Sequence, residues 1–312
     1  MRALVTGGSG FIGAHLVDKL VALGWKVSVL DLFDRRFGSL PAGVDLIRAN
    51  VSNDYAVREA LADVDVVFHL AWGTIHEVAT RDPLQDIETN AMPSVRLIDH
   101  CRNSGVRRIV FFSSGGTVYG PAQHLPIAET HPTHPINAYG ITKLAVEKYL
   151  QMYHHLYGLE YVILRPSVPY GPWQDPRRRQ GAISVFLYRA ARGETIEIWG
   201  DGSVVRDYFY ISDLVSAAVQ AATKQGLEGE QVYNVGGGQG YSLNDLVRVI
   251  QKVAGRTATV VYQPGRRFDV PEVVLDTSRA TACLEWSPEV ELTEGVERTW
   301  RWILSLEGLD EG

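Results

Sequence analysis

The sequence predicts an α/β fold in which a doubly wound parallel sheet is followed by a smaller, mixed α/β lobe. Two observations carry this prediction. Short apolar strands alternate with helix-length segments over residues 1–166, and this alternation weakens over residues 167–312. Strands that alternate with helices form parallel sheets with both faces covered. We therefore expect one domain over 1–166 and a lobe over 167–312, with some later segments returning to the sheet.

The first part of the chain supplies the strands and helices in order. Residues 3–6 form a short apolar strand, a glycine-rich turn follows, and a helix covers about 11–23, where Gly24 is a suitable C-terminal glycine. Further strands are expected at 26–30, 45–48, 64–70, 108–113 and 160–165, and further helices at 54–62, 84–104 and 138–157.

The second part of the chain is less regular. Residues 170–181 are rich in Pro, Gly, Arg and Gln and are expected to form a long loop before a helix near 182–193. Gly236-Gly237-Gly238 marks a turn. This pattern predicts a small, irregular lobe set against the sheet.

Composition narrows the class of protein. The 312 residues are 46% hydrophobic and 21% charged, with a net charge of −6, whereas a nucleic-acid surface would be basic. The longest apolar runs have strand length, so no segment is expected to span a membrane. Two cysteines make no disulfide framework and fit a reducing compartment. We expect a cytoplasmic protein without nucleic-acid or membrane partners, and no histidine spacing predicts a metal site.

A glycine-rich motif follows the first strand. Gly8-Ser-Gly10-Phe-Ile-Gly13 matches the dinucleotide-binding pattern, and Gly7 adds a second register. The motif lies between a predicted strand and a predicted helix, which is the context that gives it meaning. Glycines let the backbone approach a pyrophosphate, and the helix N-terminus favours the anion. The motif predicts a Rossmann-like domain that binds a dinucleotide through Gly7, Gly10, Phe11, Ile12 and Gly13.

Asp31 indicates which dinucleotide is bound. It ends the second predicted strand, 18 residues after Gly13. A carboxylate at this place accepts hydrogen bonds from a ribose 2′-hydroxyl and repels a 2′-phosphate. Asp31 therefore favours NAD over NADP, although Arg35 and Arg36 follow closely and leave NADP open.

Tyr139 and Lys143 lie four residues apart in a predicted helix. Four residues are about one helical turn, so both side chains share one face. Free tyrosine has a pKa of ~10, which is too high for a base at neutral pH. A neighbouring positive charge favours the phenolate, and lowering the pKa by ~3 units takes roughly 4 kcal/mol. The pair predicts a proton-transfer site beside the dinucleotide.

In these motifs the chain resembles the extended short-chain dehydrogenase/reductase family, specifically its nucleotide-sugar epimerases and dehydratases. The resemblance covers nearly the whole chain. Besides the glycine motif, Asp31 and the Tyr139–Lys143 pair, it rests on His69-Leu70-Ala71, Asn90, Ser113 to Gly120, Gly202 to Asp207 and Gly265 to Asp269.

The resemblance implies that NAD is the cofactor and assigns roles around it. Tyr139 would handle the proton of a sugar hydroxyl, and Lys143 would bind the nicotinamide ribose and lower the pKa of Tyr139. Other implied contacts with NAD are Asn50, Val51, Leu70, Ala71, Asn90 and Pro166. The family also implies a homodimer through the helices near 84–104 and 138–157.

One catalytic position departs from the family's pattern. Members usually place Ser or Thr four residues before the Tyr of Val-Tyr-Gly, where this chain has Gly115. Ser114 and Thr117 flank this position. We expect Thr117 to contact the substrate and keep Ser114 as the alternative group that bridges the substrate and Tyr139.

Substrate contacts are implied in the lobe. Arg206 and Arg266 match arginines with which the family holds a nucleotide diphosphate, because a guanidinium forks onto phosphate oxygens. Asp269 would accept hydrogen bonds from the nucleotide's ribose. Residues 177–179 are three consecutive arginines. They form either a solvated turn, or one of them, such as Arg178, contacts the carboxylate of a UDP-uronic acid.

The resemblance leaves several reactions open after hydride leaves sugar C4. A 4,6-dehydratase needs an acid pair just before Val-Tyr-Gly, where this chain has Gly115-Gly116-Thr117. A 4-epimerase needs only the tyrosine, the cofactor and room for the keto sugar to rotate. We therefore expect an NAD-dependent UDP-sugar 4-epimerase. Another nucleotide-sugar redox enzyme, a dehydratase or reductase, and a non-catalytic NAD-binding sensor are the alternatives. UDP-glucose/galactose, their N-acetyl forms and UDP-glucuronate all remain open, with dTDP as the second carrier.

Overall fold

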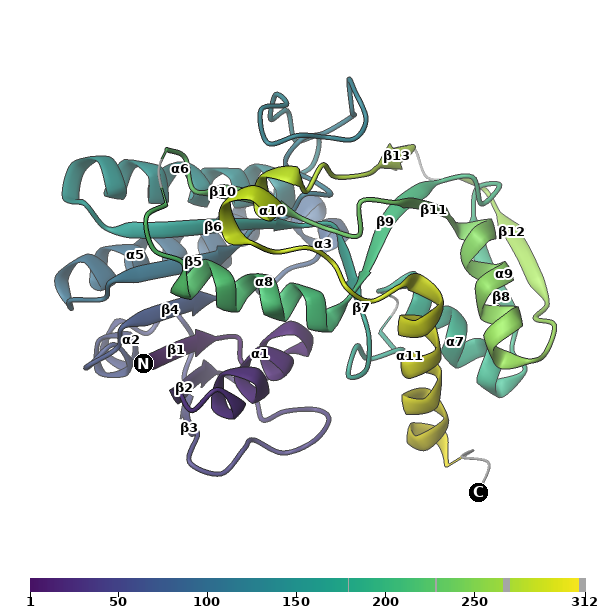
Figure 1. The fold of residues 1–312 in the computed structure, drawn as a ribbon, viewed down its shortest axis with the longest axis horizontal. Helices are drawn as coiled ribbons and strands as arrows, with labels where there is room; N and C mark the ends of the chain where they lie inside the picture. The colour runs from purple at the N-terminus through teal and green to yellow at the C-terminus, as the bar shows by residue number, and fades with distance from the viewer. Residues whose placement is uncertain (179, 228, 266–269, 309–312) are drawn as a thin grey trace.

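The computed structural model describes residues 1–178, 180–227, 229–265 and 270–308. Within these ranges, its centre is a seven-stranded parallel sheet in the order β10-β6-β5-β4-β1-β2-β3 (Figure 1). The strands are β1 (Arg2–Thr6), β2 (Lys26–Asp31), β3 (Asp45–Arg48), β4 (Val66–His69), β5 (Arg108–Phe112), β6 (Glu160–Pro166) and β10 (Val232–Val235). The order 3-2-1-4-5-6 is that of a Rossmann sheet, which confirms the predicted fold class.

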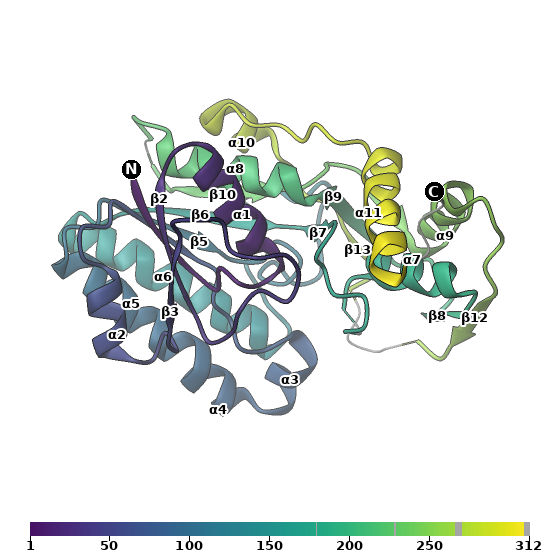
Figure 2. The same cartoon turned by 90° about the horizontal axis from the view of Figure 1, so that it is seen from below.

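Helices cover both faces of this sheet. On one face lie α1 (Phe11–Ala22) and α8 (Ile211–Thr223), and on the other lie α2 (Asp54–Ala60), α5 (Met92–Asn103) and α6 (Ala138–Tyr157), as Figure 2 shows. The side chains of β1 alternate between the two layers, since Ala3 and Val5 join the cluster of α1 whereas Leu4 joins that of α5. Burial on both faces explains why the strands consist of nearly continuous apolar residues.

The sheet draws on residues from both sides of residue 166. β10 pairs with the outer edge of β6, with Val232 opposite Ile163. Helix α8 packs against α1, β5 and β6. The apolar cluster beneath α1 and α8 also continues into the C-terminal helices, so the sheet and the lobe share one core.

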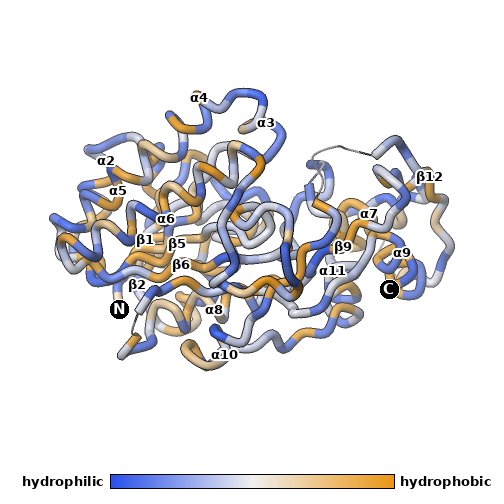
Figure 3. The backbone as a smooth tube through the Cα atoms, turned by 90° about the horizontal axis from the view of Figure 1, so that it is seen from above, coloured by the Kyte–Doolittle hydropathy of each residue, from blue (hydrophilic) through white to orange (hydrophobic). Residues whose placement is uncertain are grey.

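The lobe consists of three packed helices and two small sheets. The helices are α7 (Ala182–Arg192), α9 (Leu243–Ala254) and α11 (Leu292–Glu307), and α10 (Ser278–Leu284) lies beside β10. One small sheet contains β7 (Val168–Tyr170), β9 (Val205–Tyr210), β11 (Gly240–Ser242) and β13 (Glu272–Val273), and the other pairs β8 (Ile196–Trp199) with β12 (Val260–Gln263). Figure 3 shows hydrophobic residues along the central strands, and none of the described helices is long and apolar enough to cross a bilayer.

The predicted helix over 84–104 is confirmed, but it contains a wide turn that the sequence analysis did not predict. A short helix α3 (His76–Arg81) precedes it, and the helix itself consists of α4 (Pro83–Asp86), a π-helical turn η1 (Ile87–Ala91) and α5. Pro93 is near the start of α5 and has no backbone N–H to donate. In a regular α-helix its ring would also clash with the carbonyl four residues earlier, that of Thr89. Just before Pro93 the helix changes to the π-helical hydrogen-bond pattern, in which the Met92 N–H bonds to the carbonyl of Ile87, five residues earlier. This wide turn directs Asn90 toward the edge of the sheet.

Candidate active site

The sequence-predicted residues of the first domain converge on one edge of the sheet. The glycine turn follows β1, Asp31 ends β2, Ala71 follows β4 and Pro166 ends β6. Strands of a parallel sheet point in the same direction, so their carboxyl ends meet along one edge, where open α/β sheets bind ligands. This edge is therefore the candidate site.

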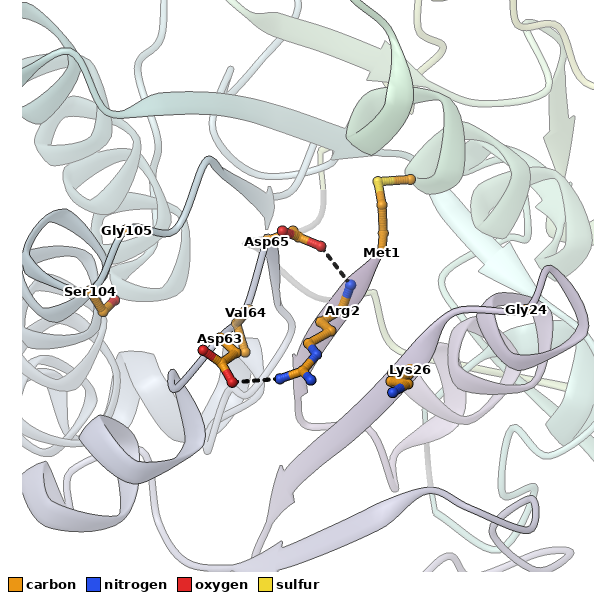
Figure 4. Close-up of a pocket in the computed structure, with 9 residues that line it drawn as sticks. All are labelled: Met1, Arg2, Gly24, Lys26, Asp63, Val64, Asp65, Ser104 and Gly105. Carbon is orange, nitrogen blue, oxygen red and sulfur yellow. Dashed lines mark hydrogen bonds and ion pairs between the residues drawn. The ribbon is translucent and has the colours of Figure 1, made fainter.

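A hollow of about 710 Å³ lies at the opposite edge (Figure 4). It surrounds the amino ends of β1 and β2 and the approach to β4. Arg2 spans it, with its guanidinium bonded to Asp63 and its backbone N–H bonded to Asp65, both at 2.7 Å. None of the described residues that are predicted to contact cofactor or substrate lines this hollow.

In the glycine turn, backbone segments approach each other closely. Gly7 has φ +74°, and a Cβ there would meet the backbone nitrogen of Ala71 at 2.7 Å. A Cβ on Gly13 would run into the carbonyl oxygen of Gly7. Gly10 is different, because its nearest neighbour would be at an ordinary 3.4 Å. At Gly7 and Gly13, neighbouring backbone atoms thus leave no space for a side chain. Helix α1 begins at Phe11 and Ile12, within the same motif.

The Asp31 carboxylate faces this turn. It accepts hydrogen bonds from the backbone N–H groups of Ser9, at 3.0 Å, and Phe33, at 3.2 Å. The Ser9 hydroxyl oxygen is buried without a hydrogen-bond partner. Buried polar atoms are seldom left unpaired in folded proteins, so this oxygen fits a site that is completed by a ligand.

Arg35 and Arg36 are committed to contacts within the protein. The buried Arg35 guanidinium pairs with Asp18 at 2.7 Å and donates to the carbonyl of Ala14 at 2.9 Å. Arg36 pairs with Asp175 at 2.8 Å, which ties the 33–40 segment to the lobe's long loop. Because both guanidinium groups already pair with carboxylates, these contacts argue against binding of the 2′-phosphate of NADP by Arg35 or Arg36.

Further predicted cofactor residues lie along the same edge. Val51 is buried and Asn50 is exposed, with its side-chain oxygen accepting from the Ser52 N–H at 2.9 Å. Leu70 and Ala71 are half-buried behind the glycine turn. Asn90 holds the segment after Ala71, since its oxygen accepts from the Gly73 N–H at 2.7 Å.

His69, at the end of β4, is held by hydrogen bonds on both ring nitrogens. Its Nδ1 lies 2.8 Å from Thr6 Oγ1 and its Nε2 lies 2.8 Å from Ser94 Oγ. The Ser94 hydroxyl donates to the Asn90 carbonyl, so its oxygen is left to accept from Nε2–H of His69. Burial lowers the pKa of His69 to about 3, and the positive charge of Lys143 adds to this. A neutral imidazole thus links β1, β4 and α5.

Tyr139 and Lys143 lie on the first turns of α6. This helix begins where the side chain of Asn137 accepts from the Gly140 N–H at 2.8 Å. Lys143 is 3% exposed, and its Nζ donates to the Phe112 carbonyl at 2.7 Å. Its Nζ lies 5.7 Å from the centroid of the Tyr139 ring. The two side chains are therefore adjacent at the end of β5.

Among the side chains of the protein by themselves, burial sets the direction of the Tyr139 pKa, and the lowering of this pKa by Lys143 in the working enzyme stays a prediction. Burial raises the pKa of Tyr139, and the negative charge of Asp86 raises it further. Burial also lowers the pKa of Lys143 to about 7, although Glu147 and Asp86 oppose this. Desolvation of a phenolate thus outweighs a nearby ammonium that is itself destabilised by burial.

The loop after β5 contains the two candidate hydroxyls. Thr117 is 4% exposed and its Oγ1 is buried without a hydrogen-bond partner, while Ser114 is half-buried. A Cβ on Gly115 would meet Leu275 Cδ1 at 2.5 Å and the Arg165 carbonyl at 2.9 Å, whereas a Cβ on Gly116 would meet nothing within 4 Å. Leu275 thus occupies the space in which a side chain at position 115 would lie.

A buried polar network that sequence reasoning missed lies beneath this loop. The Ser113 hydroxyl donates to Glu147, and Arg165 Nε donates to the same carboxylate at 3.0 Å. Arg165 also donates to the Tyr119 hydroxyl at 2.9 Å, which in turn donates to Asn234 at 2.7 Å. Glu147 lies one helical turn beyond Lys143, and this spacing was the available signal. The network fixes α6 to β6 and β10.

The predicted substrate residues are only partly described. Arg206 lies on β9, where its Nη1 donates to the Val205 carbonyl at 2.8 Å. The exposed Arg178 pairs with Asp175 at 3.6 Å. Arg179, Arg266 and Asp269 lie outside the described residues.

Two aromatic residues near the catalytic pair were not singled out in the sequence. The Trp72 ring contacts Tyr139 edge-on, with centroids 5.9 Å apart, and the His76 ring lies 4.5 Å from Tyr139. Burial lowers the pKa of His76, and the charges of Arg206 and Lys143 lower it further. The position of Trp72 directly after Ala71 was the signal for it. The described part of the chain shows no cluster of three or more His, Cys, Asp or Glu able to hold a metal ion.

Comparisons with known proteins point to the same chemistry. The model of the NAD dependent epimerase/dehydratase family matches residues 3–236. The UDP-glucose 4-epimerase of Mycolicibacterium smegmatis is 38% identical over 307 residues, covering 96% of this chain and 97% of that protein. The crystal structure of UDP-glucose 4-epimerase with UDP-glucose from Thermotoga maritima is similar with a TM-score of 0.94 at 36% identity, covering 98% and 100% of the two chains. That of the Thermus thermophilus UDP-glucose 4-epimerase complex with NAD has a TM-score of 0.89 at 35% identity, covering 97% and 99%.

Proposed function

Because this chain belongs to the NAD-dependent epimerase/dehydratase family, we propose that it is a 4-epimerase of UDP-linked sugars. Membership confirms the resemblance inferred from the motifs. The observation that carries the proposal is the placement of Tyr139 and Lys143 on one face of α6, at the same sheet edge as the glycine turn. A proton carrier beside a dinucleotide site is the minimum that C4 epimerisation needs.

NAD is the cofactor of this family, and the residues at the sheet edge fit it. The turn at Gly7 and Gly13 excludes side chains from the crossing, Asp31 presents carboxylate oxygens, and the Ser9 hydroxyl lacks a partner. These residues would hold the pyrophosphate and adenosine ribose, and Lys143 would hold the nicotinamide ribose. When bound, NAD supplies a reversible hydride acceptor at sugar C4 and a positive charge that favours the Tyr139 phenolate.

The protein's own residues would then manage the proton and the position of the sugar. Tyr139 would remove the C4 hydroxyl proton and return it after the sugar has turned. The unpartnered Thr117 hydroxyl would bind the same oxygen and so replace the hydroxyl that is missing at Gly115. The open space beside Gly116 would give the keto sugar room to rotate.

The carboxylates near the pair favour epimerisation over dehydration. Residues 113–117 contain no acid. Glu147 is engaged by Arg165 and Ser113, and Asp86 accepts from the Asn90 amide at 2.8 Å. Elimination of water needs an acid and a base at the sugar. Glu147 has other partners, whereas Oδ2 of Asp86 is buried without a hydrogen-bond partner, so these two carboxylates do not supply a free acid and base pair.

Within the UDP-sugars, we propose UDP-glucose and UDP-galactose as the substrate pair. A uronic acid would need a free cation near sugar C6. Arg177 pairs with Glu307 at 3.5 Å and Arg178 pairs with Asp175, so both guanidinium groups face carboxylates of the protein. The uronate interpretation therefore depends on Arg179, which lies outside the described residues.

The test is product analysis by NMR with purified protein and a panel of UDP-glucose, UDP-N-acetylglucosamine, UDP-glucuronate and dTDP-glucose. We expect UDP-galactose from UDP-glucose, with no net change in NADH absorbance because the hydride returns to the sugar. A sustained rise in NADH would contradict epimerisation. Faster turnover of UDP-glucuronate would overturn the sugar assignment alone.

A cytoplasmic homodimer remains part of the proposal. Of the apolar residues on the two helices that the family pairs, Leu97, Ile98 and Leu150 lie in the core, whereas Met152 is 40% exposed. Tyr149 and Leu156 on the same helix are also exposed, so α6 keeps an apolar surface. Light scattering at several concentrations tests the dimer, and an invariant monomer mass would overturn it.

A further inference from the structure

The Lys143 ammonium is buried away from direct carboxylate contact among the described residues. The Glu147 carboxylate is bound by Arg165 and Ser113, and the Asp86 carboxylate accepts from Asn90. A buried ammonium without a paired anion is costly and tends to lose its proton. Yet the proposed reaction needs this charge, since Lys143 must stabilise the Tyr139 phenolate. The Phe112 carbonyl accepts one hydrogen bond from the ammonium at 2.7 Å, and a neighbouring group that attracts the cation would stabilise the charge further.

An indole ring lies in the position to do so. Lys143 Nζ stands 3.6 Å from the centroid of the Trp72 ring, with Phe111 farther away at 4.9 Å. Indole is the best of the aromatic faces for a cation, and the attraction is largest where water is excluded. The same indole meets the Tyr139 ring edge-on at 5.9 Å with an interplanar angle of 68°. Trp72 thus contacts both members of the pair.

We propose that Trp72 is a positioning residue of this active site, whose π face binds and keeps charged the Lys143 ammonium while its edge seats the Tyr139 ring. The inference goes beyond the proposed function by assigning the source of the Lys143 charge. It rests on the proposed function only for its effect on turnover. The Trp72–Lys143 contact itself is open to a test that needs no substrate.

Other charged and titratable groups also face Lys143. They are Glu147 and Tyr139 on α6, Asp86 on α4, His76 on α3 and His69 on β4. The two carboxylates favour the ammonium, whereas burial opposes it and brings the pKa of Lys143 to about 7. At such a balance, a modest attraction decides whether the amine is charged at neutral pH.

The first experiment is the pH dependence of kcat/KM for the holoenzyme with Trp72→Leu and Trp72→Phe. Loss of the π face favours the neutral amine, so the alkaline limb of the profile should move to lower pH by about one unit in Trp72→Leu. Trp72→Phe keeps a smaller π face and should move less. A uniform loss of activity with the alkaline limb unmoved would show that Trp72 only fills space, and would overturn the inference.

The second experiment uses the fluorescence of Trp72 itself, taken as the difference between the wild type and Trp72→Phe across pH 5 to 10. Protonation of Lys143 at 3.6 Å should change this emission with a single midpoint, and Lys143→Met should abolish the transition. A transition that persists in Lys143→Met belongs to another group and overturns the inference. If the transition is found but no UDP-sugar is epimerised, the proposed function fails while the contact stands.

Discussion

Two loops at the carboxyl edge of the sheet contain small residues for opposite reasons. In the turn after β1, Gly7 and Gly13 leave no space for a side chain because backbone atoms cross there. In the loop after β5, Gly115 is crowded by Leu275 from the lobe, while Gly116 borders open space. The first loop is restricted by backbone atoms, those of Ala71 and of the turn itself. The second is restricted by the Leu275 side chain, and we propose that it provides the space and the hydroxyl for the substrate.

The largest effect on turnover should come from Tyr139→Phe, since both loops lie at the sheet edge where this side chain would transfer the proton. Loss of the phenol removes the proton carrier, so we expect turnover to fall by about 10³-fold, or ~4 kcal/mol in the barrier. The glycine turn is untouched, so the amount of NAD released on acid denaturation should equal that of the wild type. A variant that loses both NAD and turnover would show that Tyr139 supports the cofactor loop as well.

The cofactor loop is tested by Gly13→Ala with Gly10→Ala as its matched control. A Cβ at position 13 meets the Gly7 carbonyl and forces the backbone apart, whereas at position 10 it has ordinary contacts. We expect NAD affinity to fall by about 100-fold, on the order of 3 kcal/mol, in Gly13→Ala alone. Calorimetric titration with NAD measures this. Equal losses in both variants would contradict the steric distinction.

The substrate loop is tested by Gly115→Ser, which restores the hydroxyl that the family usually has. Its Cβ would lie 2.5 Å from Leu275 Cδ1, so we expect a loss of about 1–3 kcal/mol in the free energy of unfolding. Leu275→Ala alone should also be destabilising, by about 2–5 kcal/mol, because Leu275 is fully buried. The double variant Gly115→Ser with Leu275→Ala should lose less than the sum of the two single losses, because truncation of Leu275 vacates the space. Gly116→Ala should match the wild type in stability. Urea unfolding compares these variants with the wild type, and additive losses in the double variant would refute the steric account.

The smallest effect on stability should come from Thr117→Val. The hydroxyl is buried and unpaired, so its replacement by a methyl group should leave the free energy of unfolding unchanged or raise it by ~1 kcal/mol. Turnover should nevertheless fall, because the substrate oxygen loses a partner. Ser114→Ala is the companion variant. If it alone impairs turnover, Ser114 is the bridging group.

Several features of this edge were predictable because they depend on neighbours in the sequence. The glycine turn, Asp31 at the end of β2 and the four-residue spacing of Tyr139 and Lys143 follow from strand and helix geometry. An irregularity in the helix over 84–104 was predictable in principle from Pro93, yet the π-helical turn before it was not.

Other features involve residues far apart along the chain. No local spacing in the sequence predicts three of these contacts, which are Trp72 with Lys143, Leu275 with Gly115 and Arg36 with Asp175. The pKa of Tyr139 is a further case, since the sequence shows a nearby lysine but not how deeply both groups are buried.

By itself, the sequence determined the α/β class, the glycine turn and the placement of Tyr139 and Lys143 on one helical face, because each depends on local spacing. Only the tertiary structure decided how deeply that pair is buried and that the Thr117 hydroxyl is buried without a hydrogen-bond partner. Burial and cation–π contact depend on which side chains from distant segments exclude water, and that is settled when the sheet, α6 and the lobe pack together.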